Sequence, residues 1–285
     1  MLVTPSVVAA RYRSEIRQEI RSLGTSLKVV GFLCGDYGPS HTYAEYTRSA
    51  CEDLGIHYEL RCVERNTLEQ EIEAANDDDA VNGIMIYYPI FGNEQDRYLK
   101  DVVDYRKDIE GLNSFWIHKL YENERLVSGD NQHGKAVVPC TSLAVIKILE
   151  ANGAYGTSMT RPVENKTITI FNRSEVVGRP LAVMMSNDGA RVYSFDEFGP
   201  MLYSEGEGRE VSISRAEALA ASDLVITGVP SKQFPKVRYE ELAPHSICLN
   251  FATIKNFAAD VEEKAELFIP RVGPVNVAMC MRNPL

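Results

Sequence analysis

The stretch Lys166-Thr-Ile-Thr-Ile-Phe-Asn-Arg-Ser-Glu-Val-Val-Gly-Arg-Pro180 decides the fold of this chain. Residues 167–171 are β-branched or aromatic, as is typical of a buried parallel strand. Asn172, Arg173 and Ser174 then form a polar turn. The apolar residues after the turn fit a helix with one buried face: Val176, Val177, Leu181, Val183 and Met184. Because a helix start offers unpaired backbone N–H groups and the positive end of a dipole, this unit predicts a phosphate-binding turn.

A second predicted strand lies further along the chain and ends in two acids. Residues 190–195 form the strand, and Asp196 and Glu197 follow directly. An acid at this place accepts hydrogen bonds from an adenosine ribose and repels a 2′-phosphate, so the pair predicts a dinucleotide domain that prefers NAD. The glycine pattern alone is weak, because only Gly178 stands at a glycine position of the usual G-x-G-x-x-G turn. An ordinary strand–turn–helix unit of an α/β protein is the alternative.

The composition is that of a globular protein with one large or two modest domains. The chain has 285 residues, of which 45% are hydrophobic, and a formal net charge of −10. No run approaches the roughly 20 apolar residues of a membrane span, and the N-terminus lacks the pattern of a secretory signal. Basic residues are not interleaved with aromatic ones, so we expect neither a nucleic acid nor a membrane as a partner.

The cysteines indicate a reducing compartment. Six are scattered along the chain without C-x-x-C spacing, and several fall inside predicted strands. Buried free thiols are therefore expected rather than disulfides or a metal site. We predict that the chain binds no metal and resides in the cytoplasm.

Helical and strand-like segments alternate through both halves of the chain, which predicts an α/β fold with parallel sheets. The first half predicts helices at 4–23, 40–54 and 68–75 and strands at 27–34, 58–63 and 83–88. The second half predicts a helix at 141–149, strands at 167–171, 190–195, 223–230 and 246–251, and a closing helix after Arg271. Residues 121–135 are polar and loop-like and predict a domain boundary, and residues 205–209 predict a flexible loop.

Several short motifs carry a specific resemblance over nearly the whole chain. They are Tyr43-Ala-Glu-Tyr-Thr47, Tyr87-Tyr-Pro-Ile90, Lys107-Asp-Ile-Glu-Gly-Leu112, Pro139-Cys-Thr-Ser142, Asn172-Arg-Ser-Glu-Val-Val-Gly-Arg-Pro180 and Val272-Gly-Pro-Val-Asn-Val-Ala-Met279. In order, they resemble Y-x-x-x-K, Q-L-P-L, K-D-V-D-G-L, P-C-T-P, G-R-S-x-x-V-G-x-P and V-G-P-M-T-V-A-M of the methylenetetrahydrofolate dehydrogenase/cyclohydrolase family. The departures from this pattern make the chain similar to the monofunctional, NAD-dependent branch known from fungi.

The resemblance implies two αβ domains with a cleft between them. Residues 1–135 would form the folate-binding catalytic domain, to which a helix at 272–285 returns, and residues 136–271 would form a Rossmann-type NAD-binding domain. The implied reaction is the oxidation of 5,10-methylenetetrahydrofolate to 5,10-methenyltetrahydrofolate with hydride transfer to NAD, in one-carbon metabolism and purine biosynthesis. A homodimer through the cofactor domains is also implied.

Two departures concern the hydrolytic reaction of the family. Its catalytic lysine falls at Thr47 when residues 50–56 fix the register, and the glutamine that tunes this lysine falls at Tyr87. A threonine hydroxyl carries no positive charge and cannot replace an ammonium. The resemblance therefore implies a dehydrogenase without cyclohydrolase activity. A shifted register, in which Lys119 or Lys135 supplies the amine, is the alternative.

Two other functions stay open. One is a bifunctional dehydrogenase/cyclohydrolase, against which Thr47 argues. The other is a catalytically silent folate- or NAD-binding regulator, which the preserved Tyr43, Glu110 and cofactor turn disfavour.

The folate site follows from the resemblance. The ring of Tyr43 would lie against the folate, although a core tyrosine on a helix is the alternative, and Glu110 stands where relatives have a pterin-binding aspartate. Cys140 would lie where nicotinamide and folate meet; no histidine pattern supports a nucleophile, and a small apolar residue beside a helix start is the alternative. The predicted catalytic positions are Tyr43, Thr47, Tyr87 and Cys140, and the predicted substrate-binding residues are Tyr43, Tyr87, Pro89, Glu110, Gly273 and Pro274.

The cofactor site centres on Arg173, which matches the arginine that contacts the 2′-phosphate in NADP-using relatives. Beside Asp196 and Glu197 it could instead pair with a carboxylate or with the diphosphate. Two carboxylates facing a phosphate dianion disfavour NADP. The predicted NAD-binding residues are Asn172, Arg173, Ser174, Val177, Gly178, Asp196, Glu197, Thr227, Gly228, Val229 and Pro230.

Overall fold

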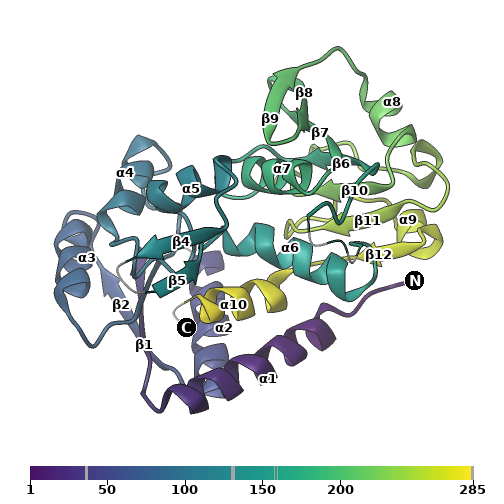
Figure 1. The fold of residues 1–285 in the computed structure, drawn as a ribbon. Coiled ribbons are helices and arrows are strands. Elements are labelled where there is room, and N and C mark those ends of the chain that lie inside the picture. The colour runs from purple at the N-terminus through teal and green to yellow at the C-terminus, as the bar shows by residue number, and fades with distance from the viewer. Residues whose placement is uncertain (36–37, 130–131, 157, 159, 284–285) are drawn as a thin grey trace. The chain divides into compact units, whose positions relative to one another are not determined.

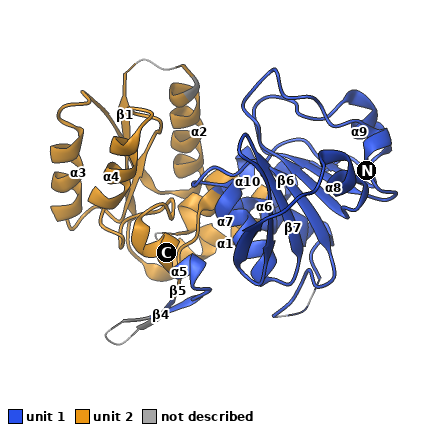
Figure 2. Ribbon diagram, turned by 90° about the horizontal axis from the view of Figure 1, so that it is seen from above, with its two compact units in different colours: residues 1–8, 119–134, 141–275 blue, residues 9–118, 135–140, 276–285 orange. Residues whose placement is uncertain are grey.

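The computed structural model describes residues 1–35, 38–129, 132–156, 158 and 160–283. The chain divides into two compact units, which are coloured separately in Figure 2. Unit 1 comprises residues 1–8, 119–134 and 141–275, and unit 2 comprises residues 9–118, 135–140 and 276–285. Each unit has its own sheet of mainly parallel strands joined by helices, so the α/β prediction is confirmed.

Unit 1 is built on a seven-stranded sheet in the order β12-β11-β10-β6-β7-β8-β9 (Figure 1). The parallel strands are β6 (Thr167–Phe171), β7 (Arg191–Asp196), β10 (Leu224–Thr227), β11 (Ile247–Asn250) and β12 (Leu267–Ile269). Four helices belong wholly or mostly to this unit: α6 (Cys140–Ala151), α7 (Gly178–Asn187), α8 (Arg215–Ala220) and α9 (Ala259–Lys264), with a 3-10 turn η1 at Tyr239–Glu241. The strand order reverses between β6 and β10, and open α/β sheets bind ligands at such a reversal.

The β6–α7 unit forms largely as its sequence predicts. Ile168 and Ile170 of β6 are fully buried, and α7 buries Leu181 and Val183. The prediction was wrong at the start of the helix, because residues 175–177 form a turn and α7 begins at Gly178. It was also wrong for Met184, which is only partly buried, because the face that packs on the sheet includes Met185 instead.

Two segments predicted as loops contain strands. Residues 205–209 form a tight hairpin in which β8 (Gly199–Ser204) and β9 (Glu207–Glu210) pair in antiparallel fashion across Glu205 and Gly206. Both turn residues have positive φ, which matches the twist of two-residue hairpins. The polar segment 121–135 likewise contains two paired short strands, β4 (Leu126–Gly129) and β5 (Gln132–Lys135). Polar composition hid β9, because all four of its residues are exposed and show no apolar pattern.

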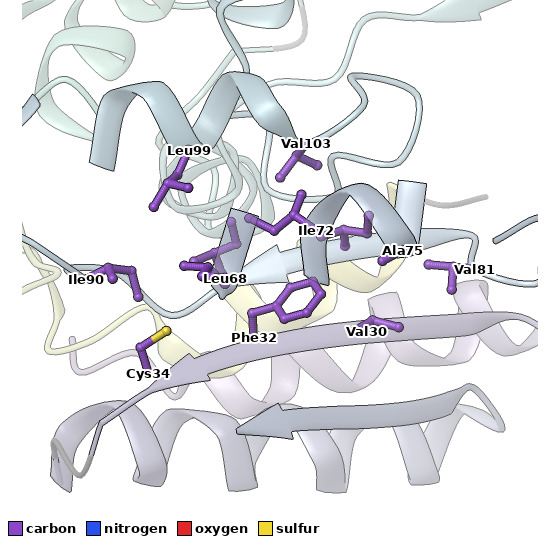
Figure 3. Packing of buried hydrophobic residues seen from close by; sticks show 12 residues of the cluster. Val30, Phe32, Cys34, Leu68, Ile72, Ala75, Val81, Ile90, Leu99 and Val103 are labelled. Carbon is purple, nitrogen blue, oxygen red and sulfur yellow. The ribbon is translucent and has the colours of Figure 1, made fainter. Parts of the chain in front are cut away.

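Unit 2 contains a three-stranded parallel sheet in the order β2-β1-β3, formed by β1 (Lys28–Cys34), β2 (His57–Val63) and β3 (Gly83–Ile86). Its helices are α1 (Pro5–Leu23, from residue 9 onward), α2 (Gly38–Leu54), α3 (Leu68–Asp77), α4 (Glu94–Val102), most of α5 (Ser114–Tyr121) and the last part of α10 (Gly273–Arg282). On one face of the sheet, Val30 and Phe32 pack against α3 and α4 through Leu68, Ile72 and Leu99 (Figure 3).

The other face of this sheet positions polar groups. Gly31 of β1 pairs with Met85 of β3, and Val29 pairs with Tyr58 of β2. Because side chains alternate along a strand, Gly31, Tyr58 and Met85 share the face opposite Phe32. This second face carries the candidate folate site.

Candidate active site

In unit 1, the turn after β6 is shaped around Gly178. A Cβ atom at this residue would lie 2.1 Å from the backbone oxygen of Asn172 and 2.4 Å from its Oδ1. Only glycine therefore fits where α7 begins this close to the end of β6. The Asn172 side chain completes the turn, because its Oδ1 accepts hydrogen bonds from the Ser174 backbone N–H (3.0 Å) and hydroxyl (2.8 Å), and its amide donates to the Gly228 carbonyl (2.8 Å).

Arg173, the middle residue of this turn, is bound to the end of β7. Its Nε donates to Asp196 Oδ2 at 2.7 Å, and its Nη2 donates to Asp196 Oδ1. The same guanidinium also donates to the carbonyls of Ser194 (3.3 Å) and Gly199 (2.7 Å). Of the two ways in which the sequence allowed Arg173 to act beside the acids, the structure shows the pairing with a carboxylate. Glu197, the second acid, is exposed.

The end of β10 supplies the third side of the predicted cofactor site. Gly228 lies against the ring of Phe251, since a Cβ atom there would lie 1.8 Å from Phe251 Cζ. The backbone of Val229 is held by Asn256, which donates to the Val229 carbonyl (3.0 Å) and accepts from its N–H (2.9 Å). Thr227 is buried and donates to Asn250 Oδ1 at 3.0 Å. Sequence reasoning missed Asn250 and Asn256; a buried asparagine bonded to backbone has no local sequence signal.

These residues fit a dinucleotide. Gly178 lets α7 begin directly against the end of β6, so the N-terminus of α7 lies at the edge of the sheet where β6 ends. Asp196 ends β7, where a ribose would be recognised. Val177 caps α7 from this turn, with its carbonyl bound to the Leu181 N–H and the Ser142 hydroxyl. Pro230 follows Val229 and is exposed.

In unit 2, the sequence-predicted Tyr43, Thr47 and Tyr87 come together with Tyr58, and we call these four residues the tyrosine cluster. The rings of Tyr43 and Tyr87 meet edge to face, with centroids 5.7 Å apart. The hydroxyls of Tyr87 and Tyr58 are 2.5 Å apart and hydrogen-bonded. The Thr47 hydroxyl donates to the Tyr43 carbonyl at 3.0 Å, one helical turn back along α2. Thr47 and Tyr87 are buried, with exposed fractions of 1% and 4%.

Tyr43 is only partly buried, so it is not a sealed core residue. Its hydroxyl accepts a hydrogen bond from the Asn276 amide of α10 at 2.9 Å. Burial raises the pKa of the Tyr43 phenol well above its usual value, and the nearby Cys280 and Glu110 act in the same direction. The phenol is therefore neutral near pH 7, and its ring face remains the feature suited to a flat ligand.

The loop that carries Glu110 is organised by Asp108, which sequence reasoning passed over. The buried Asp108 carboxylate accepts backbone hydrogen bonds from residues 110, 111, 112 and 113, at 2.7–3.0 Å. The Lys107 ammonium anchors the start of the loop by donating to the carbonyls of Ala75, Asn76 and Asp78 at the end of α3. Gly111 has a φ of 71° and packs on the backbone of Val138, so a side chain there would be doubly unfavourable.

Glu110 itself lines a small pocket with Tyr88, Lys100 and Asp108. Its Oε2 accepts a hydrogen bond from the Ile86 N–H at 3.1 Å. Burial raises the pKa of the Glu110 carboxyl to about 8; the Ile86 hydrogen bond and Lys100 oppose the rise, and the charge of Asp108 adds to it. A carboxyl poised near neutrality in a pocket is typical of a ligand-binding or catalytic group.

Cys140 is a buried thiol at the start of α6. Its Sγ donates to the Ile109 carbonyl at 3.0 Å, its backbone N–H donates to the Glu110 carbonyl at 3.1 Å, and the Asn283 amide donates to the same Ile109 carbonyl at 2.7 Å. Burial raises the pKa of the Cys140 thiol well above its usual value, with Cys280 as the next contribution. A neutral buried thiol is a poor nucleophile. The hydrogen bonds of Cys140 to Ile109 and Glu110 instead hold the Glu110 loop in place.

The remaining predicted residues lie at element ends. Pro89 follows a cis peptide bond after Tyr88 and is exposed, and the next three backbone N–H groups, of residues 90–92, all bind the Asp96 carboxylate. Gly273 and Pro274 open α10. Over the residues that the structure describes, we find no cluster of histidine, cysteine and acid side chains suited to a metal. No described helix is long and apolar enough to cross a membrane.

The Rossmann-type sheet, the glycine-shaped turn and the acid at the end of β7 are typical of nicotinamide-dependent dehydrogenases. Comparison with known families supports both units. Residues 4–110 match the tetrahydrofolate dehydrogenase/cyclohydrolase catalytic domain, and residues 139–234 match the NAD(P)-binding domain of the same family. The chain belongs to the tetrahydrofolate dehydrogenase/cyclohydrolase family, and the resemblance seen in its motifs is confirmed.

Individual relatives support the same family. The methylenetetrahydrofolate dehydrogenase [NAD(+)] of Dictyostelium discoideum is 41% identical over 99% of this chain and 92% of its own length, and that of Saccharomyces cerevisiae is 39% identical over 99% and 94%. A solved structure of the NAD-dependent 5,10-methylenetetrahydrofolate dehydrogenase from Saccharomyces cerevisiae matches with a TM-score of 0.91 at 38% identity, covering 99% of this chain and 95% of that chain.

Proposed function

We propose that this chain oxidises 5,10-methylenetetrahydrofolate to 5,10-methenyltetrahydrofolate with NAD, and that it releases the methenyl product without hydrolysing it. The dehydrogenase assignment is supported by the family and by relatives named for the NAD-dependent reaction. The absence of hydrolysis rests on one observation: the hydroxyls of Thr47 and Tyr87 are buried and already bonded to Tyr43 and Tyr58.

Oxidation of this substrate asks the protein for orientation more than for a base. The reacting carbon lies between two nitrogens, which stabilise the cation that remains when a hydride leaves, and bound NAD supplies the hydride acceptor. In this proposal, Tyr43 holds the folate with its ring, and the ring is itself fixed by Tyr87 and by the Asn276 amide. Glu110 accepts hydrogen bonds from the pterin. Held in near-attack geometry, the two carbons need no further acid or base.

Hydrolysis of the methenyl cation is different, because water must be activated and the leaving nitrogen protonated. Thr47 has no charge and directs its only proton to the Tyr43 carbonyl. Burial raises the pKa of the Tyr87 phenol far above neutrality, so it cannot serve as a base. The tyrosine cluster therefore supplies neither group.

The preference for NAD rests on Arg173. Its guanidinium is nearly buried and bound to the Asp196 carboxylate and to two carbonyls, so it is not available for a 2′-phosphate. Asp196 would keep enough acceptor capacity for a ribose hydroxyl, since each carboxylate oxygen accepts more than one hydrogen bond. Asn172, Ser174 and Gly178 would face the diphosphate, and residues 227–230 the nicotinamide half.

Further expectations come from the sequence or from the resemblance and stay predictions. They are folate contacts by Pro89, Gly273 and Pro274, domain limits at residues 135 and 271, a homodimer formed through the cofactor domains, and a role in the cytoplasm in one-carbon metabolism and purine biosynthesis. Light scattering of the purified protein tests the dimer.

An absorbance assay tests the function. Purified protein is mixed with methylenetetrahydrofolate and either NAD or NADP, and methenyltetrahydrofolate is followed by its absorbance. We expect turnover with NAD and little with NADP. In a second arm, methenyltetrahydrofolate is mixed with protein or buffer alone, and we expect equal decay. Enzyme-accelerated decay would identify a bifunctional enzyme, and no turnover with either cofactor would identify a silent binding protein.

A further inference from the structure

Tyr58 of β2 belongs to the tyrosine cluster although no motif of the sequence points to it. It is 8% exposed, and its hydroxyl lies 2.5 Å from that of Tyr87, with which it shares a hydrogen bond. Tyr58 lies on β2, whereas Thr47 lies on α2 and Tyr87 directly follows β3. The buried hydrogen-bond partner of the Tyr87 hydroxyl is therefore Tyr58, whose position is set by strand β2.

Gly31 makes room for this contact. A Cβ atom on Gly31 would lie 2.2 Å from the Tyr58 hydroxyl and 3.1 Å from the Tyr87 ring. Gly31 lies inside a buried strand and has no positive φ, so backbone conformation does not call for glycine. A glycine inside a strand often marks a close approach by another group. Here the group is the tip of Tyr58, so Gly31, Tyr58 and Tyr87 fit together as one packed unit.

Each hydroxyl group of the tyrosine cluster already has a hydrogen-bond partner. Thr47 donates to the Tyr43 carbonyl, and the hydroxyls of Tyr58 and Tyr87 bond to each other. Burial raises the pKa of both phenols, so both stay neutral near pH 7. The Tyr87 hydroxyl also donates a weak hydrogen bond to Met85 Sδ at 3.6 Å.

We propose that Tyr58 is a positioning residue that, together with Thr47 and Tyr87, determines that the methenyl product leaves unhydrolysed. Its hydroxyl fixes the Tyr87 phenol in this chain and would draw an ammonium introduced at position 47 toward the sheet, away from the product. This inference rests on the proposed function. According to this inference, the presence of Thr47 and Tyr87 in place of the family's lysine and glutamine does not by itself account for the missing hydrolysis.

The consequence concerns an ammonium introduced at position 47. In a Thr47→Lys, Tyr87→Gln protein, the new ammonium could donate to two acceptors. One is the amide oxygen at position 87. The other is the Tyr58 hydroxyl, which in the unaltered chain lies 2.5 Å from the Tyr87 hydroxyl. A hydrogen bond from an ammonium to a neutral oxygen in a buried site is strong, so Tyr58 would compete for the ammonium and hold it toward the sheet. Tyr58→Phe removes this acceptor and keeps the ring over Gly31.

The test compares four proteins for the decay of methenyltetrahydrofolate against buffer: the unaltered chain, Tyr58→Phe alone, Thr47→Lys with Tyr87→Gln, and the triple variant. We expect no acceleration by the first two, little by the double variant, and at least about tenfold faster hydrolysis by the triple variant than by the double, which corresponds to the loss of one charge-assisted hydrogen bond. The melting temperature is measured for all four proteins, to confirm that each is folded.

The outcomes separate the two claims. Acceleration by the unaltered chain would overturn the proposed function itself. With an inactive unaltered chain, full hydrolysis by the double variant would show that Tyr58 is not a determinant. A triple variant that is folded and still no faster than the double would overturn the inference as well.

Discussion

The guanidinium of Arg173 and the carboxylate of Asp196 form a two-point ion pair across the ends of β6 and β7. The Arg173 side chain is 5% exposed, and that of Asp196 is 23% exposed. The pair is placed by sheet register, because Phe171 of β6 lies beside Phe195 of β7. Arg173 comes two residues after Phe171, and Asp196 comes one residue after Phe195 as the last residue of β7. The Arg173 guanidinium is thereby held at the end of β7.

Asp196→Ser should weaken the preference for NAD. Without its carboxylate partner, the Arg173 guanidinium can donate to the 2′-phosphate of NADP. A hydrogen bond between charged groups contributes ~1.5–3 kcal/mol. We therefore expect the ratio of kcat/KM for NADP to kcat/KM for NAD to rise roughly ten- to a hundredfold. The measurement is the steady-state rate with each cofactor. Glu197→Ser is the matched control, since Glu197 is exposed, and it should change the ratio much less. An unchanged ratio in Asp196→Ser would mean that the ion pair does not set cofactor choice.

Much of unit 1 could be predicted from sequence, because its strands are continuous apolar runs and its turn has a recognisable motif. Gly178, at the start of α7, and Asp196, at the end of β7, were singled out from the sequence in this way. The Arg173–Asp196 pair could be named only as one of several options, since its formation depends on which strands lie side by side. Tyr58 and Asp108 were missed for a related reason: the first acts across a sheet and the second binds backbone, so neither differs in sequence from an ordinary strand tyrosine or loop acid.

Gly178→Ala should lower both stability and cofactor affinity. The added methyl would lie 2.1 Å from the Asn172 backbone oxygen, and because backbone cannot move aside cheaply, α7 must shift away from β6. We expect a loss of about 1–3 kcal/mol in the free energy of unfolding, as for overpacked sites, and a raised KM for NAD with little change in KM for folate. Gly134→Ala, where the new methyl meets open space, is the control. Equal stability of the two variants would contradict the packing argument.

Glu110→Gln should make stability less dependent on pH. The pKa of the Glu110 carboxyl is raised by burial from 4.5 to about 8, so the folded protein keeps a proton that the unfolded chain releases. This group therefore contributes a decrease in stability as pH rises from about 4.5 to about 8, and no further change above that. The free energy of unfolding is measured by urea titration at several pH values. We expect its value for Glu110→Gln minus its value for the unaltered protein to rise as the pH goes from about 4.5 to about 8. Glu73→Gln, at an exposed site, should show no such trend.

The same carboxyl should give folate binding a pH dependence. Only the ionised Glu110 can accept from all donors of the pterin edge, so folate affinity should rise with pH toward about 8, by up to about tenfold per pH unit, and then level off. Binding is measured by fluorescence titration without NAD. The profile of Glu110→Gln should be flat over this range, and a flat profile in the unaltered protein would show that the protonated form binds equally well.

Asp108→Asn should loosen the loop that presents Glu110. The carboxylate of Asp108 accepts four backbone N–H groups, two on each oxygen, and an asparagine offers one oxygen and two further donors. Two buried N–H groups would then face an NH₂ group, which we expect to cost roughly 3 kcal/mol in the free energy of unfolding. Because the loop carries Glu110, KM for folate should rise while KM for NAD stays unchanged. Asp79→Asn, an exposed acid of unit 2, controls for the loss of one charge. If Asp108→Asn were as stable as this control and bound folate normally, the carboxylate would not be what organises the loop.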